Sequence, residues 1–422
     1  MMKRRVFVVF CETVSPLGQN AEQLALRLQE NHSAVGPMTH FDASGLTQPQ
    51  ACEVKEDLIS LLPSDGNDWG SIARYDRKFA LLAAVVNQHK VKLQQMVGAF
   101  AASRVGISLG LGANVFPMEN IALEVEDVTT EGLYKTLERV NKPIHNKFNA
   151  IFNHTDLYAN YLQHTLGRVG FSKNILTACS SSTQSLAYAA SSIMAGQADL
   201  ILAGGTDSIL NNFAYISFGK LGVLTNDVCR PFDVNRSGAI AGECAGIAVL
   251  ASEEGVKALG VDPEFELIGF GNTLDAHKIT APDPSGLGVE RAMRKAMDMA
   301  GCGPEQIQYI NAHGTGTRSN DEVELRAIER VMGDAAREIY VSSTKDRHGH
   351  SIAAAGIQEF QVLLSSMKQS LIPANLNIQK PIETSLQLPM SRNVKANIKV
   401  GMTNNFAFGG VNCSLIIKHM KA

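Results

Sequence analysis

A cysteine and two histidines follow short apolar segments in this chain of 422 residues. Cys179 comes after residues 174–178 and His313 after residues 307–312. The second histidine is one of the pair His348 and His350, which comes shortly after residues 338–343. A cysteine thiolate is a strong nucleophile, and a nearby histidine can move protons or donate hydrogen bonds to a reacting group. The sequence therefore predicts covalent catalysis by Cys179, with His313 and one of the two histidines His348 and His350 as catalytic partners.

The setting of Cys179 predicts an activated thiol. Residues 180–195 have the apolar spacing of a helix, so Cys179 would lie at the amino end of that helix. The first-turn amides and the helix dipole favour an anion there and would lower the thiol pKa from its free value of about 8.5. The alternative is that Cys179 only packs in the core, as free cysteines often do.

Three further loops carry residues suited to chemistry. In the loop after His313, the hydroxyls of Thr315 and Thr317 alternate with glycines that let a ligand approach closely. Lys345 comes shortly before His348 and His350 and could orient one of these two histidines. A glycine-paired turn at residues 404–412 carries two phenylalanines. Taken singly, the second loop could be a solvated polar loop and the third a structural hairpin, so the prediction depends on their combination.

The elements that must position these residues form a plan that occurs twice. A strand, a helix and a second strand are predicted over residues 174–205, and again over residues 307–343. Parallel strands joined by helices place their carboxyl ends at one edge of a sheet, where ligands bind. We therefore predict an α/β protein with two halves, residues 1–255 with the nucleophile and residues 256–422 with the histidines. The boundary follows a strand over 246–251 and a short turn at 253–255.

Composition excludes several classes of function. The net charge of −3 gives no global field for nucleic acid or for an anionic membrane. The apolar run at residues 6–10 is too short to span a membrane and is interpreted as a first strand. Seven scattered cysteines without a CxxC pair fit neither a disulfide framework nor a metal site. We therefore expect reduced thiols, no metal and a cytoplasmic location.

Ten short motifs occur in order along nearly the whole chain. They lie at residues 13–18, 177–180, 203–207, 230–238, 242–246, 311–317, 343–345, 349–350, 371–377 and 406–410. In this order they resemble the elongating β-ketoacyl-acyl-carrier-protein synthases of fatty acid and type II polyketide synthesis, which belong to the thiolase superfamily. The resemblance implies a thiolase-like fold, in which duplicated β-α-β halves form a layered α-β-α-β-α body.

The resemblance also implies a reaction. A decarboxylative Claisen condensation would join a carrier-bound malonyl unit to an acyl chain held on Cys179, giving a β-ketoacyl carrier protein. Neutral His313 and His350 would donate hydrogen bonds to the malonyl carbonyl oxygen. A positive Lys345 would disfavour imidazolium and would anchor His350 through a carboxylate such as Glu359.

Other residues receive roles from the same resemblance. The backbone N–H groups of Cys179 and Phe408 would form the oxyanion hole, and Phe408 would also gate the acyl pocket. Thr315 and Thr317 would hold the pantetheine amides. The remaining assignments are Asp321 as a supporting residue, and Phe406 and Gly409 as substrate-binding residues.

The expected partners follow from this reaction. The enzyme would bind no cofactor of its own, because its substrates arrive on the phosphopantetheine arm of an acyl carrier protein. Such carriers are acidic, so docking would use a local basic patch. The candidates for that patch are Arg74, Arg77, Lys78, Lys142 and Lys147, for each of which a solvated surface charge is the alternative. A homodimer, or a heterodimer with a ketosynthase-like paralogue, is expected.

Three competing interpretations explain the sequence less well. Residues 106–110 match the G-x-S-x-G elbow of a serine hydrolase, but Ser108 lies inside an apolar strand with no helix directly after it. Two short glycine pairs, at 110–112 and 269–271, lack the third glycine of a dinucleotide loop. A non-catalytic sister chain of a two-subunit synthase would lack the nucleophile, whereas Cys179 and both histidines are present.

Overall fold

The main strands form two groups with the same internal order. The computed structural model describes residues 4–62, 69–113 and 156–422. Within these residues the neighbours run β5-β4-β6-β7-β1 in the first group and β10-β9-β13-β14-β8 in the second. In both groups the first three strands are parallel and the last two join antiparallel. The repeat confirms the predicted duplication, and a short pairing of β1 with β8 links the two groups.

The strands of the first group are β1 (Phe7–Val14), β4 (Val105–Leu111), β5 (Phe171–Ile175), β6 (Leu200–Ser208) and β7 (Ala241–Ala251). Those of the second group are β8 (Phe265–Leu274), β9 (Tyr309–Asn311), β10 (Tyr340–Ser342), β13 (Val400–Ala407) and β14 (Val411–His419).

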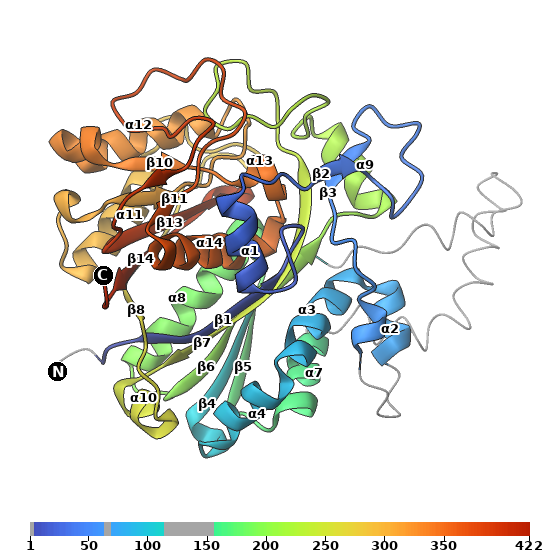
Figure 1. Ribbon diagram of the computed structural model, residues 1–422, viewed down its shortest axis with the longest axis vertical. Coiled ribbons are helices and arrows are strands. Elements are labelled where there is room, and N and C mark those ends of the chain that lie inside the picture. Colours follow the sequence, from blue (N-terminus) through green and yellow to red (C-terminus); the bar gives the residue numbers. More distant parts are fainter. Residues whose placement is uncertain (1–3, 63–68, 114–155) are drawn as a thin grey trace, which may run out of the picture.

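Helices cover both outer faces and fill the space between the two groups of strands (Figure 1). The inner layer consists of α8 (Ser181–Met194) and α14 (Ala355–Gln369), which pack against each other. The outer layer of the first half consists of α3 (Arg77–Gln88), α4 (Lys90–Gly98) and α7 (Leu157–Leu166). That of the second half consists of α11 (Leu287–Ala300) and α12 (Asp321–Met332). The predicted α-β-α-β-α layering is therefore confirmed.

Smaller elements decorate these layers. The helices are α1 (Ala21–Gln29), α2 (Trp69–Tyr75), α9 (Asn212–Lys220), α10 (Glu253–Leu259) and α13 (Lys345–His348). The strands are β2 (Val35–Pro37), β3 (Gln50–Cys52), β11 (Leu371–Ile372) and β12 (Val394–Lys395). Within the described ranges, none of the helices is both long enough and apolar enough to cross a membrane.

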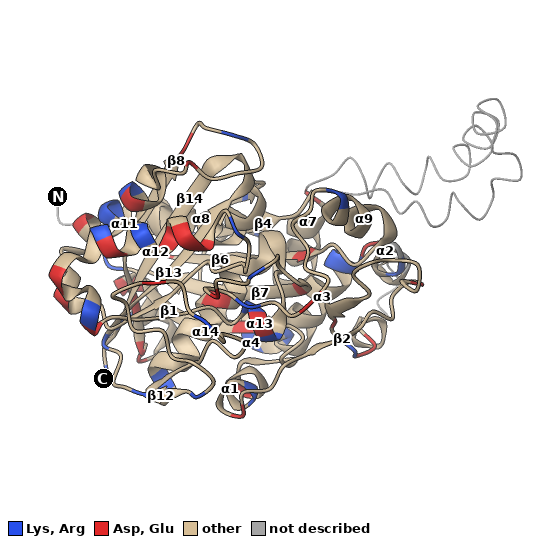
Figure 2. Cartoon of the chain, turned by 90° about the horizontal axis from the view of Figure 1, so that it is seen from above, with Lys and Arg blue, Asp and Glu red and all other residues tan. Residues whose placement is uncertain are grey.

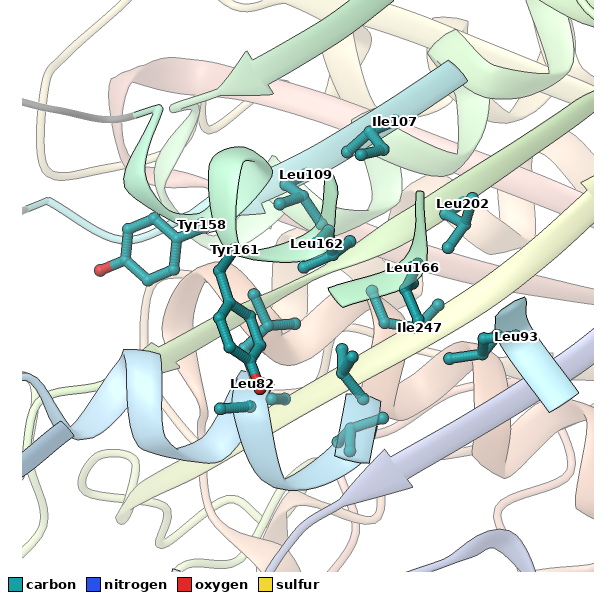
Figure 3. Packing of buried hydrophobic residues seen from close by; sticks show 14 of the residues in the cluster. Leu82, Leu93, Ile107, Leu109, Tyr158, Tyr161, Leu162, Leu166, Leu202 and Ile247 are labelled. Carbon is teal, nitrogen blue, oxygen red and sulfur yellow. The ribbon is translucent and has the colours of Figure 1, made fainter. Parts of the chain in front are cut away.

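Separate apolar cores hold the layers together. Between the first sheet and its outer helices, side chains of α3 and α7 such as Leu82 and Leu162 pack on Leu109 and Ile247 of the strands (Figure 3). A second core surrounds α8 and α14, and a third lies between the second sheet and α11 with α12. Because α8 and α14 are covered by sheet on both sides, their amino ends are held rigidly.

Two glycines allow these amino ends to approach closely. A Cβ on Gly110 of β4 would lie 2.3 Å from the backbone nitrogen of Ser182 at the start of α8. A Cβ on Gly356 of α14 would lie 2.0 Å from Oγ1 of Thr183 and 2.5 Å from its backbone nitrogen. Real Cβ atoms do not come this near to backbone, so only glycine permits α8 to approach β4 at Gly110 and to cross α14 at Gly356.

Local boundaries differ from the sequence predictions in two places. The strand before Cys179 ends at Ile175, because the chain turns at Ala178, which has a positive φ of 50°. The segment predicted as a short turn at 253–255 begins α10, because Ser252 accepts a hydrogen bond from the backbone of Gly255 and caps the helix. The division at residue 256 therefore falls inside a helix, and the two halves as separate units stay a prediction.

We expect Gly356→Ala to destabilise the protein by about 1–3 kcal/mol, because the new methyl group would overpack the crossing of α8 and α14. Gly98→Ala in α4 is the matched control, since a Cβ there meets nothing within 4 Å. That variant should be neutral or slightly stabilising. Thermal unfolding compares the two, and a melting temperature of Gly356→Ala at or above that of Gly98→Ala would contradict the expectation.

Candidate functional site

Cys179 lies in a tight turn that aims its sulfur at the second half of the protein. The turn, Ala178–Ser180, leads directly into α8. Ala178 has a positive φ, which residues other than glycine seldom adopt. The sulfur lies 3.1 Å from Nε2 of His350, and the backbone N–H of Phe408 donates a hydrogen bond to it. A nucleophile, a base and a backbone donor thus meet at one point.

His313 completes the cluster. It follows β9, and its ring lies 5.4 Å from that of His350, centroid to centroid, at an angle of 81°. One nitrogen of each ring and the sulfur of Cys179 lie within 4.8 Å of one another. The three residues come from both halves of the chain, and the structure brings them together as the sequence predicted.

The cluster is buried, and burial determines the pKa of the thiol. Loss of hydration raises the pKa of Cys179 to about 12, although Lys345 and the Phe408 N–H oppose the rise. The prediction of a lowered pKa was therefore wrong for the resting site. The end of α8 does favour an anion, but the sulfur is cut off from water and the carboxylates of Asp207 and Glu359 also raise the pKa.

Burial acts on the histidines in the opposite direction. It lowers the pKa of His313 well below its usual value, and the positive charge of Lys345 and the neighbouring His350 lower it further. Burial, then Lys345 and then His348 lower the pKa of His350 in the same way. Both rings are therefore neutral near pH 7. This agrees with the predicted effect of Lys345, although burial is the larger cause.

Lys345 is fully buried and paired. Its Nζ forms an ion pair with Glu359 of α14 and donates a hydrogen bond of 2.6 Å to the carbonyl oxygen of His313. Glu359 makes no hydrogen bond to His350; its second oxygen accepts from Asn405 at 2.7 Å. The predicted anchoring of His350 through Glu359 is therefore wrong, because the ion pair supports the backbone of His313 instead.

Two buried carboxyl groups hold the loop after His313. Glu324 of α12 accepts hydrogen bonds of 2.8 Å from the backbone N–H groups of His313 and Gly314. Asp321 accepts from the backbone N–H of Gly316 and lies 3.5 Å from Oγ1 of Thr315. Asp321 thus lies where a supporting residue was expected, and Glu324 is a second support that the sequence analysis missed.

A small cavity of about 60 Å³ lies beside the cysteine. Its walls are mainly apolar, with the hydroxyl-bearing Thr315 and Thr317 among them. These two hydroxyls are hydrogen-bonded to each other at 2.8 Å. The predicted site residues that line the cavity are Cys179, His313, His350, Thr315, Thr317, Phe406 and Phe408. Gly409 is exposed and is not among the lining residues.

The predicted basic patch is only partly retained. Lys78 is buried and donates to the carbonyl oxygen of Ala113, and Arg77 forms an ion pair with the buried Glu243. These two residues therefore do not present free charge to a partner, which corrects the prediction for them. Arg74 is exposed on α2. The last two candidates, Lys142 and Lys147, lie outside the described residues.

Charges elsewhere on the surface are largely mixed. Figure 2 shows both signs interspersed along α11 and α12 on the outer face of the second half. Glu290 of α11, for example, is shared by Arg294 and Arg330. Among the described members of the proposed patch, Arg74 is the one that is exposed.

Cys179, His313 and His350 are also the side chains, among those described, that are close enough to share a metal ion. A divalent cation there would face the buried positive charge of Lys345. It would also occupy the nucleophile and both histidines at once. The set is better suited to proton transfer and hydrogen bonding than to metal binding.

Sequence reasoning missed two polar residues behind the cluster. Asn405 of β13 contacts Glu359, His313 and Thr183, and Asp207 of β6 accepts from the backbone N–H of Ala353. Both lay in motifs that had been noticed, but neither residue type suggests a reaction by itself. No signal in the sequence distinguished them, because each becomes informative only once its neighbours are known.

Comparison with known proteins agrees with this geometry. A family model described as beta-ketoacyl synthase, N-terminal domain, matches residues 3–255, and the model of the C-terminal domain matches residues 265–379. The chain belongs to the β-ketoacyl synthase family. The ten motifs found in the sequence, which include those of Cys179, His313 and His350, had indicated this family.

Relatives of this β-ketoacyl synthase match over its whole length. Nodulation protein E of Rhizobium meliloti is 33% identical over 421 residues, covering 99% of this chain and 100% of that protein. 3-oxoacyl-[acyl-carrier-protein] synthase 2 of Staphylococcus aureus is 31% identical over 426 residues, covering 99% of each. The solved ishigamide ketosynthase/chain length factor has a TM-score of 0.85 at 28% identity, covering 99% of each chain. The predicted thiolase-type fold is thereby confirmed.

We expect Lys345→Met to cost about 3–5 kcal/mol of stability, because Glu359 would be left buried without its cation. Adding Glu359→Gln should restore part of that loss, which a double-mutant cycle of unfolding free energies measures. Equal losses from the single and the double variant would contradict the pairing.

The same variant should also change the pH dependence of activity. Lys345 lowers the pKa of both histidines, so its removal raises those values toward normal. As the solution is acidified, both rings then become protonated at a higher pH than in the wild type. We therefore expect the acid limb of the rate profile of the Lys345→Met, Glu359→Gln double variant to move to higher pH. An unmoved limb would exclude this charge effect.

Proposed function

We propose that the protein catalyses decarboxylative Claisen condensation of a malonyl thioester with an acyl chain carried on Cys179, in chain elongation. The observation that carries the proposal is the cluster itself, in which a cysteine sulfur and two neutral histidines lie within 4.8 Å of one another in a buried site. Membership of the β-ketoacyl synthase family supports the same chemistry.

The first step is acyl transfer. The thiol keeps its proton at neutral pH, because its pKa is about 12, so a base must remove that proton during attack. His350 is placed for this role, with Nε2 at 3.1 Å from the sulfur. The sulfur attacks the thioester carbonyl, and the backbone N–H groups of Cys179 and Phe408 would stabilise the oxyanion. The departing pantetheine thiolate takes the proton from His350, which returns the ring to the neutral state.

The second step uses the histidines as donors. The carbon–carbon bond to the malonyl carboxylate breaks, carbon dioxide leaves, and its electron pair remains as an enolate on the thioester. Neutral His313 and His350 can each donate one N–H to the enolate oxygen. The enolate carbon then attacks the acyl-cysteine carbonyl, a carbon–carbon bond forms, and the cysteine sulfur leaves as a thiolate, which takes up one proton from solvent.

The substrates would reach this site on a phosphopantetheine arm. Thr315 and Thr317 line the cavity beside the cysteine. Their hydroxyls could exchange the hydrogen bond between them for hydrogen bonds to the amides of such an arm. An acyl carrier protein is the proposed partner; a related type II polyketide ketosynthase has been solved in complex with its acyl-carrier protein. The seven cysteines are free thiols, which fits a reducing compartment such as the cytoplasm.

We also propose a dimer, either with a second copy or with a paralogue. Among the described strands, β5 is at one end of the large sheet, and its residues are half-buried or exposed. An open strand edge is normally covered in a native assembly. A solved structure of the same fold is described as a ketosynthase in complex with its chain length factor, and that description supports a paralogue as the alternative partner.

Intact-protein mass spectrometry tests the first step. After incubation with a panel of acyl carrier proteins, the wild type should gain one acyl group and Cys179→Ala none. Cys302→Ala removes a half-buried thiol outside the site and should still be loaded. Addition of malonyl carrier protein should then discharge the acyl enzyme as a ketoacyl product. Acylation of Cys179→Ala to the same extent as wild type would disprove the assignment of the nucleophile.

Docking is tested by reversing one charge. Arg74→Glu should raise KM for the acyl carrier protein several-fold, because the carrier is acidic, and should leave kcat nearly unchanged. Arg27→Glu on α1 is the control, since Arg27 is also exposed but lies on another helix. The same KM and salt dependence in both variants would remove Arg74 from the docking surface.

A further inference from the structure

The amide of Asn405 is fully buried and contacts three groups behind the catalytic cluster. Its Nδ2 donates a hydrogen bond of 2.7 Å to Oε2 of Glu359 and lies 3.4 Å from Nδ1 of His313. Its Oδ1 accepts a hydrogen bond from Oγ1 of Thr183 on α8. Asn405 therefore connects the ion pair of Lys345, the amino end of the nucleophile helix and one catalytic ring.

These contacts fix which end of the amide faces the ring. Glu359 shares its other oxygen with the Lys345 ammonium, so it faces Asn405 as a carboxylate that only accepts. The NH₂ end of Asn405 must point toward it, and the oxygen then meets the Thr183 hydroxyl, which can donate. The same NH₂ group faces Nδ1 of His313.

An amide NH₂ group cannot accept a hydrogen bond, so Nδ1 of His313 must be the unprotonated nitrogen of the ring. A neutral imidazole carries one proton, which then lies on Nε2. We propose that Asn405 is a positioning residue that holds His313 as the Nε2–H tautomer, so that the ring donates a hydrogen bond to the enolate oxygen. This inference rests on the proposed condensation and adds the residue that sets the proton.

His350 differs from His313 in this respect. Its Nδ1 has no hydrogen-bond partner among the described residues, and its Nε2 faces the sulfur of Cys179. No neighbour fixes its tautomer, so the same nitrogen can accept the thiol proton in acyl transfer and donate in decarboxylation. A change at Asn405 should therefore impair decarboxylation and leave acyl transfer to Cys179 nearly unaffected.

Asn405→Asp is the decisive substitution. The substitution replaces the NH₂ group by an oxygen. The new carboxyl group would share one proton with Glu359, which lies 2.7 Å from the replaced nitrogen, and its oxygen would accept a hydrogen bond from the ring. This stabilises the Nδ1–H tautomer, which leaves Nε2 without a proton. Misplacing the proton of a catalytic histidine can cost up to about 10⁴-fold in rate. We expect malonyl-carrier decarboxylation to fall by at least about 100-fold, while the rate of Cys179 acylation stays within about threefold of wild type.

Further variants guard against misfolding. Asn405→Leu removes the amide without adding charge, so both tautomers are populated and decarboxylation should fall less than about tenfold. Thr183→Val removes the hydroxyl that fixes the amide and should give a smaller loss of the same step. Asn404→Leu is the matched control, because Asn404 is the adjacent buried residue of β13 but its Nδ2 faces the sulfur of Met293 on α11. It should leave both rates unchanged.

Nitrogen NMR of enzyme labelled with ¹⁵N-histidine reads the tautomer directly, and the His313→Ala spectrum assigns the signal. Nε2–H on His313 in wild type and Nδ1–H in Asn405→Asp would support the proposal. Nδ1–H in wild type, unchanged decarboxylation in Asn405→Asp, or a parallel loss of acylation would overturn it. A wild type that neither loads nor decarboxylates would instead refute the proposed function, and the NMR result would still decide the role of Asn405.

Discussion

The buried ion pair between Lys345 and Glu359 is the interaction on which the site depends. An uncompensated charge in this interior would cost several kcal/mol, so loss of either partner alone destabilises the protein. The pair joins four elements of the second half. Lys345 begins α13 and binds His313, which follows β9, while Glu359 of α14 binds Asn405 of β13. Through these contacts one positive charge is held near both histidines without touching either ring.

The duplicated halves explain how the nucleophile meets this charge. The turn before α8 and the turn before α14 are equivalent, and each contains a residue with positive φ, Ala178 at 50° and Ile352 at 44°. Cys179 thus corresponds to Ala353, whose backbone N–H binds Asp207 at the end of β6. The equivalent strand of the second half is β13, and Phe408 just after it donates to the sulfur of Cys179. The turn before α8 thus carries the nucleophile Cys179, whereas the turn before α14 carries Ala353 and follows His350.

Sequence patterns predicted the features that depend on chain order. The duplicated strand-helix-strand plan and the strand-end placement of Cys179 and His313 follow from local periodicity and residue type. The neutral rings beside Lys345 were implied by the resemblance to the family. The thiol pKa did not follow, because burial by residues from both halves outweighs the local effect of a helix end. Lys78 was misjudged because the sequence of an amphipathic helix does not show that the sheet covers this lysine. Asn405 was missed because an amide in a strand becomes informative only once its three neighbours are known.

The opposite pKa shifts of thiol and imidazole give the resting site its character. Burial disfavours the charged form of either group, so the proton stays on the sulfur and both rings are neutral. If Cys179 were a permanent thiolate paired with an imidazolium, His350 could not accept a further proton. The imidazolium would also place a second positive charge beside Lys345. The neutral cluster avoids both problems, because each ring keeps one donor and one acceptor nitrogen. Charge then develops only when a thioester carbonyl lies within reach of the donors, and this confines the reactive state to the moment of bond formation.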